Sequence, residues 1–298
     1  MRLEMRINQE ELAERMYISP RQLSRIETGE KQLDIWQFVS ILETLGLPSE
    51  DYWLLYLETQ EYEDYRRYRL LKRLIREEQL NEQYIESKKV LAQLEDSLLA
   101  QQPFIRQFVA YVKIKVSVEL SPEQAIKELY KALSISKPDF DENKVSEYRL
   151  NYNEIFLINN LASRYGKLKN YERAIALYKG IIEGRKKIQA SEDDKAALFP
   201  PIMFSLSNML GMFGKHKESL KYCERALEVC REYDNLRLVP RIMHNMAINQ
   251  QLLNEEERVY RLNLVRAYHC AYAIGDNSTA ITIKKDAEEN FGITDLDL

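Results

Sequence analysis

The side chains with the clearest chemistry gather in the first thirty residues. The candidates are Gln9, Ser19, Arg21, Gln22 and Arg25. An arginine guanidinium can donate two hydrogen bonds to O6 and N7 of guanine, and a glutamine amide can pair with N6 and N7 of adenine. Hydroxyl and amide groups at a helix N-terminus can bind phosphate oxygens. These residue types could contact nucleic acid if a helix presents them on one outward face, but without a recognisable motif each arginine is better explained as an ordinary solvated side chain.

The first of two short helices that could position these groups is expected from Gln9 to Met16. Asn8 precedes it as an N-cap, because its side-chain oxygen can accept a hydrogen bond from a free N–H group of the first turn. Leu12 and Ala13 fall on one face at helical spacing. This apolar face would pack against the next helix.

The second helix is expected to begin after Ser19, a preferred N-cap residue. Pro20 suits its first turn, where a missing N–H has little consequence. Leu23 and Ile26 form the inward stripe, so the arginine and glutamine side chains face outward. Gly29 ends the helix, because glycine readily takes the positive φ of a helix terminus.

Two further helical stretches follow. An amphipathic stretch from Ile35 to Leu45 stops at Gly46, and an aromatic-rich stretch runs from Asp51 to Glu63. A stiff helix at the second position would couple the orientation of the N-terminal module to the rest of the chain.

The segments Gln9–Met16 and Ile18–Gly29 together resemble the Cro/C1 (XRE) type of helix-turn-helix. They share its alanine where two helices touch, its short turn and its Ser-Arg-Ile-Glu-Thr-Gly ending. The resemblance implies DNA binding with the second helix in the major groove. It also implies that Gln9 holds a phosphate and that the groove-facing residues are Ser19, Arg21, Gln22 and Arg25. The family's first helix is longer than this chain allows before Arg6, so we expect a shortened first helix.

The rest of the chain shows an internal repeat. Small residues occur in a first helix at Ala162 and Ser207, and twelve residues later in a second helix at Ala174 and Ser219. Small side chains let two antiparallel helices approach closely, and the pattern resembles the tetratricopeptide repeat. Ala125 marks a weaker unit, and the spacing between units exceeds the usual ~34 residues. We therefore expect divergent units, about five of them, with a C-terminal capping helix.

Stacked helix pairs form a superhelix whose concave surface is lined by the first helix of each pair. An asparagine there can both donate to and accept from the backbone of an extended peptide, while apolar neighbours hold its side chains. An asparagine on a helix can equally be a cap or a solvated side chain, so each position has two interpretations. The groove-facing candidates, from the first unit to the fifth, are Tyr65, Tyr68, Lys72, Phe156, Asn159, Ser163, Phe204, Asn208, Arg241, His244, Asn245 and Asn249.

Composition narrows the functional classes. The 298 residues carry a formal net charge of −4, so any surface for nucleic acid must be local. Three cysteines (Cys223, Cys230, Cys270) are too few and too far apart for a disulfide framework. We find no glycine-rich phosphate loop, GxSxG elbow, HExxH motif or Cys/His metal spacing, so neither an enzyme nor a cofactor nor a metal site is expected. With no signal peptide or membrane-spanning apolar run, a cytoplasmic protein is expected.

The order of these parts resembles the RRNPP family of quorum-sensing regulators, and PlcR-type members most. The resemblance covers essentially the whole chain. It implies a homodimer that binds double-stranded DNA and a short signalling peptide. The expected fold is all-α: a helix-turn-helix over residues 1–47, a linker helix over 48–60, and a right-handed superhelix of about five tetratricopeptide-like pairs with a capping helix over 61–298. Two alternatives stay open: a Rap-like inhibitor or phosphatase that grips a signalling protein, and a repressor that needs no ligand.

Overall fold

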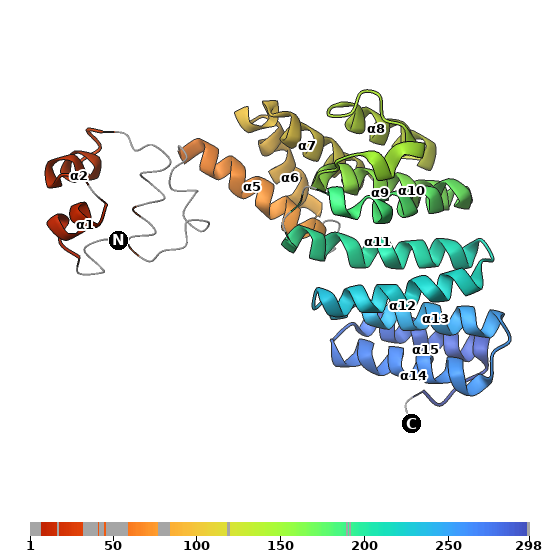
Figure 1. Ribbon diagram of the computed structural model, residues 1–298. Coiled ribbons are helices and arrows are strands. Elements are labelled where there is room, and N and C mark those ends of the chain that lie inside the picture. The colour runs from red at the N-terminus through yellow and green to blue at the C-terminus, as the bar shows by residue number, and fades with distance from the viewer. Residues whose placement is uncertain are drawn as a thin grey trace.

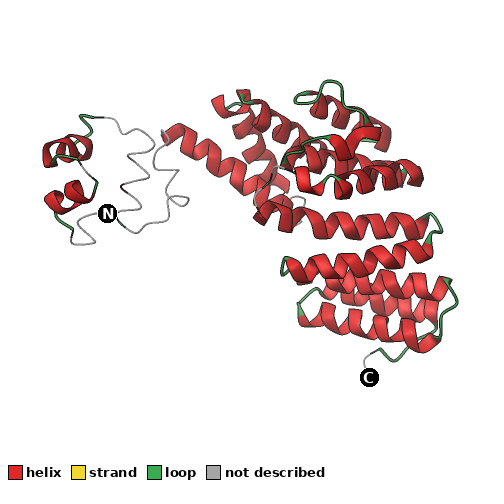
Figure 2. Ribbon diagram, in the orientation of Figure 1, coloured by secondary structure: helices red, strands yellow, loops and turns green. Residues whose placement is uncertain are grey.

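The computed structural model describes residues 7–16, 18–31, 41, 45, 59–76, 84–117, 120–188, 190 and 192–296. Every regular element within these ranges is a helix (Figure 2), so the expected all-α fold is confirmed. No helix in this part of the chain is long and apolar enough to cross a membrane.

The N-terminal module consists of α1 (Gln9–Arg15) and α2 (Pro20–Glu27), which pack against each other. Leu12, Ala13 and Leu23 are almost completely buried between them, as the spacing predicted. Gly29 takes a φ of +76° just after α2, the positive φ predicted for a helix terminus.

The larger body is a stack of helix pairs (Figure 1). In the part of the chain that is described, the pairs are α5 (Thr59–Arg76) with α6 (Tyr84–Glu95), α7 (Pro103–Val116) with α8 (Pro122–Ser134), α9 (Tyr152–Lys167) with α10 (Tyr171–Glu183), α11 (Glu192–Met212) with α12 (His216–Glu232), and α13 (Val239–Leu252) with α14 (Glu257–Ala273). A last helix, α15 (Asn277–Phe291), packs on α14 and α13. Short 3₁₀ turns lie in the connections: η1 (Leu98–Gln101), η2 (Glu142–Glu147), η3 (Arg185–Lys187) and η4 (Leu236–Leu238).

The first helices of successive pairs form an inner layer. Besides its own partner, α9 contacts α7 and α11, and α13 contacts α11 and α15. The first helices of a repeat stack line its concave surface. Side chains on α9, α11 and α13 are therefore the ones that meet across successive units.

Small residues allow the close crossings on which this stack depends. Ala162, Ala174, Ser207 and Ser219 have no exposed surface. The Ser219 hydroxyl on α12 donates a hydrogen bond of 2.7 Å to the backbone oxygen of Ser207 on α11. The two units predicted most clearly from sequence thus pack through the predicted small residues.

α5 pairs with α6 as the first unit, but the contacts of two of its predicted groove residues are unexpected. It was predicted as the inner helix of a first ordinary unit, with Tyr68 and Lys72 facing the groove. Instead, Tyr68 packs on Phe104 and Phe108 at the beginning of α7, and Lys72 reaches the beginnings of α9 and α11. In Figure 1, α5 slants towards the start of α11.

Some expectations lie mostly or wholly outside the described residues. These are the shortened first helix before Arg6, nearly all of the stretch Ile35–Leu45, and most of the linker helix over 48–60. α5 begins at Thr59 and continues through the expected domain boundary at residues 60 and 61.

Candidate DNA-reading helix and inner repeat face

The N-terminus of α2 is fixed by a capping box. The Ser19 hydroxyl oxygen accepts from the backbone N–H of Gln22 at 3.2 Å, and the Gln22 side-chain oxygen accepts from the Ser19 N–H at 3.0 Å. These two bonds satisfy N–H groups that a helix start leaves unpaired. α2 therefore begins at a defined residue, which sets the direction of its outward side chains.

Four of the five predicted DNA-binding residues are exposed on or just before α2: Ser19, Arg21, Gln22 and Arg25. The fifth, Gln9 at the start of α1, is half-buried, and its amide nitrogen donates to a Glu27 carboxylate oxygen at 2.8 Å. Arg25 lies 3.6 Å from the Glu30 carboxylate, with both side chains more than half exposed. An exposed pair of this kind is worth at most about 1 kcal/mol. Arg25 can therefore readily exchange Glu30 for a phosphate or a base edge.

On the inner face, α9 and α11 hold the predicted residues that most resemble a ligand surface. Phe156, Asn159, Ser163, Phe204 and Asn208 are all half-buried, on neighbouring helices that contact each other.

Asn159 carries the clearest unmet polar group of the inner face. Its side-chain oxygen is buried and has no hydrogen-bond partner in the structure. The nearby Asn160 was not predicted; its amide nitrogen donates to the Phe156 carbonyl oxygen at 2.8 Å. An unpaired buried oxygen costs free energy unless another group donates to it. Asn159 is thus the predicted residue of α9 with an unmet acceptor; the side-chain oxygen of Asn153, which was not predicted, is likewise buried without a partner.

Two asparagines of α13 have a different role from the one predicted. Asn245 donates to the Ser207 hydroxyl at 3.0 Å and to the Cys223 sulfur at 3.3 Å. Asn249, which is only 1% exposed, donates to the backbone and side-chain oxygens of Asn245 and lies 2.9 Å from Nδ1 of His216. These amides fasten α13 to α11 and α12, so Asn249 is not available to a ligand in this structure.

Two candidates of the fifth unit, His244 and Arg241, already have partners. His244 Nε2 lies 2.6 Å from the Asp286 carboxylate on α15. Arg241 is exposed, and its Nε donates to the Thr279 hydroxyl at 3.5 Å. Burial acts to raise the pKa of Asp276 at the start of α15, but its bonds to the Thr279 hydroxyl and N–H, together with the positive charge of Arg241, lower that pKa overall. These side chains therefore join α13 to α15.

The candidates on α5 gather at one end of the inner layer. Tyr65 is half-buried against Tyr68, which is 6% exposed and packed on α7, so Tyr68 is not free to contact a ligand. Lys72 Nζ lies 2.7 Å from Asp194 and 4.1 Å from the centre of the Tyr152 ring. Neither Tyr152 nor Asp194 was predicted, because nothing in their local sequence distinguishes them from ordinary helix-start residues.

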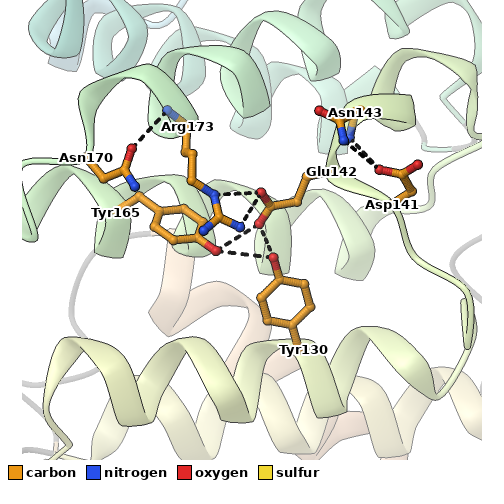
Figure 3. A network of polar contacts seen from close by, with 7 residues as sticks. All are labelled: Tyr130, Asp141, Glu142, Asn143, Tyr165, Asn170 and Arg173. Atoms are coloured by element: carbon orange, nitrogen blue, oxygen red, sulfur yellow. Dashed lines mark hydrogen bonds and ion pairs between the residues drawn. The ribbon is translucent and has the colours of Figure 1, made fainter.

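A second polar network lies between α8, η2, α9 and α10 (Figure 3). The Glu142 carboxylate accepts from the hydroxyls of Tyr130 and Tyr165 and, at 2.8 and 3.0 Å, from the Arg173 guanidinium. Burial and this carboxylate together raise the pKa of Tyr130 well above its usual value. Because Glu142 joins three helices from two successive units, this cluster stabilises the stack. No group of three or more potential metal ligands occurs in the described ranges.

Comparison with known proteins agrees with this division of the chain. A family model for helix-turn-helix domains matches residues 1–52, and one for the tetratricopeptide repeat matches residues 157–188 and 205–233. The repeat matches fall on α9–α10 and α11–α12, the units predicted most clearly. No curated protein matches by sequence.

Solved structures show the same architecture over nearly the whole chain. PlcR of Bacillus thuringiensis, in complex with the peptide PapR7 and DNA, is similar with a TM-score of 0.70 and 15% identity over 95% of each chain. ComR of S. thermophilus, in complex with DNA and its signalling peptide ComS, has a TM-score of 0.66 and 17% identity, over 98% of this chain and 97% of the other. The pheromone receptor Rgg2 of Streptococcus dysgalactiae has a TM-score of 0.60 and 14% identity, over 97% and 96%.

The fold and the two sites define a class: an N-terminal helix-turn-helix module followed by a tetratricopeptide-like body. Within that class, the chain has the fold of the RRNPP regulators PlcR, ComR and Rgg2, as the sequence resemblance implied.

Proposed function

We propose that this protein is a cytoplasmic, non-enzymatic transcription regulator that binds DNA through α2 and whose DNA binding is controlled by a short peptide held on the inner face of the repeats. The observation that carries the proposal is the exposed, basic and rigidly capped α2 in a chain with the fold of peptide-bound, DNA-bound regulators.

DNA contact by α2 follows from its chemistry. Arg21 and Arg25 project from the face of α2 opposite the buried Leu23. Recognition helices of this type place their N-terminal residues against base edges in the major groove. Operators for such modules contain two half-sites, so the protein acts as a homodimer in this proposal.

Peptide contact is proposed for α9 and α11. Asn159 offers an unmet oxygen to a peptide N–H, and Asn208 lies on the next inner helix. Phe156 and Phe204 supply half-buried aromatic surface beside them. Amides flanked by aromatic rings suit an extended peptide whose backbone is bonded and whose apolar side chains are packed.

The test is fluorescence anisotropy with labelled DNA from upstream of the protein's own gene, with and without synthetic peptides encoded by the adjacent reading frame. We expect a peptide-dependent change in affinity. Arg21→Ala should weaken binding by about 1–3 kcal/mol at the preferred site. Arg231→Ala, which removes an exposed arginine from α12, is the matched control and should leave DNA affinity unchanged.

The outcomes separate the alternatives. Tight DNA binding that no peptide changes would favour a repressor without a ligand. Absence of DNA binding would contradict the proposal and favour a repeat domain that grips a signalling protein.

A further inference from the structure

α5 contacts α7, the next inner helix, and also reaches the two inner helices beyond it. The ring of Tyr68 lies 4.7 Å from that of Phe108 and 6.1 Å from that of Phe104, measured between centroids, in edge-on arrangements. Both phenylalanines lie in the first two turns of α7, which begins at Pro103. Tyr68 therefore anchors the middle of α5 to the N-terminal end of α7.

One turn further along α5, Lys72 contacts two more inner helices at the same end. Its ammonium lies 4.1 Å from the centre of the Tyr152 ring, and Tyr152 is the first residue of α9. The same ammonium lies 2.7 Å from the carboxylate of Asp194, in the first turn of α11. α5 thus touches the beginnings of α7, α9 and α11 in succession.

The charges of Lys72 and Asp194 suit their positions at the N-terminus of α11. A helix N-terminus carries partial positive charge from its unpaired N–H groups, so a carboxylate in the first turn of α11 is favoured there. Lys72 then neutralises Asp194 from the neighbouring helix. The two side chains are only 19% and 13% exposed, which shields the pair from solvent ions. Two further ion pairs lie within α5 itself: Arg67 with Asp64, at 24% and 3% exposed, and Arg66 with Glu63, at 61% and 42% exposed.

We propose that α5 is a strap across the N-terminal ends of α7, α9 and α11, and that the Lys72–Asp194 ion pair, seated on Tyr152, is the clasp that holds its C-terminal half. Three inner helices that belong to different units are thereby held to a single helix. If the proposed function holds, a ligand that shifts α9 against α11 must also move α5, which begins seven residues after the matched helix-turn-helix region.

Hydrogen–deuterium exchange of the full-length protein, followed by mass spectrometry, tests the clasp without DNA or peptide. Lys72→Met and Asp194→Asn should each raise the exchange rate of amides in residues 63–76 about tenfold, because the local opening of α5 becomes easier. Amides of α13 and α14, which lie away from the strap, should keep their rates. The matched control Arg66→Met, which removes a charge from the exposed pair of the same helix, should change the α5 rates less than twofold.

A double variant, Lys72→Met with Asp194→Asn, distinguishes a clasp from a general packing role. Because both changes remove the same ion pair, α5 exchange in the double variant should stay within about threefold of the faster single variant. The inference is overturned if both single variants leave α5 exchange unchanged, if they accelerate exchange throughout the chain, or if their accelerations multiply in the double variant. None of these measurements depends on DNA binding, so the inference about α5 and the proposed function can be refuted separately.

Discussion

The two interpretations of a repeat asparagine, internal fastener or ligand contact, lead to opposite predictions for Asn249 and Asn159. Asn249 is 1% exposed and takes part in hydrogen bonds of 2.7 and 3.0 Å to Asn245 and of 2.9 Å with His216. At about 1 kcal/mol for each bond, Asn249→Ala loses about 3 kcal/mol of stability. Alanine regains roughly 0.5 kcal/mol through its higher helix propensity. We therefore expect a net loss of about 2–3 kcal/mol.

Asn159→Ala should behave differently, because its buried side-chain oxygen has no partner to lose. We expect its stability to stay within about 0.5 kcal/mol of the original protein, since the helix propensity of alanine offsets the lost packing. Its peptide affinity should fall, while its peptide-free DNA binding should not.

Urea denaturation monitored by circular dichroism compares the two variants directly. A shift of the midpoint with an unchanged slope reports stability alone. The reasoning is refuted if Asn249→Ala is as stable as the original protein, or if Asn159→Ala is destabilised as much as Asn249→Ala. Either result would mean that the hydrogen bonds do not separate fasteners from ligand contacts.

Two further predictions follow from close packing and from burial. Gly180→Ala on α10 would place a new Cβ 2.7 Å from Cβ of Val145, closer than two such atoms approach. We therefore expect the free energy of unfolding to fall by about 1–3 kcal/mol, with a lower thermal midpoint. An unchanged midpoint would show that η2, which carries Val145, moves aside freely. Burial raises the pKa of the Cys223 and Cys230 thiols to about 11, and it also raises the pKa of Cys270. Because Cys223 and Cys230 are buried whereas Cys270 is half-buried, only Cys270 should react readily with a disulfide reagent at pH 8. Reaction of the other two should accelerate about tenfold per pH unit up to about pH 11, and fast reaction of all three thiols at pH 8 would contradict this assignment.

Sequence patterns predicted the parts of the molecule in which neighbours along the chain decide the structure. The capping role of Ser19 and the positive φ of Gly29 depend only on local backbone geometry, and both are confirmed. The small residues of the repeats, such as Ala174 and Ser219, were also predictable, because a fixed spacing between them implies one repeated helix crossing.

The contacts of α5 could not be predicted in this way. Periodicity showed that Tyr68 and Lys72 share a face of one helix, but it contains no information on the angle at which that helix crosses its neighbours. Asp194 is far from Lys72 in sequence, so only the three-dimensional arrangement of the units brings them together.

The internal hydrogen bonds of Asn245 and Asn249 could not be predicted for a different physical reason. A side-chain amide bonds equally well to a peptide and to its own protein, so its residue type cannot distinguish the two. The repeat pattern sets the register of α13 only to within one residue. A shift of one residue decides whether Asn249 faces the inner surface of the stack or the contact with α12.

The polar fastening of α13 has a consequence for how freely the units could be exchanged. A stack held together by apolar surface alone would tolerate duplication or shuffling of its units, since the hydrophobic effect is not directional and one apolar face can replace another. Here, Asn245 and Asn249 require Ser207, Cys223 and His216 on the preceding pair. Without these partners, the fifth unit would lose the hydrogen bonds of the Asn245 amide nitrogen and of the Asn249 side-chain oxygen. These contacts thus specify the order of the last two units. A chimaera that separates the two units should fold only if the partner residues are transplanted together with the fifth unit.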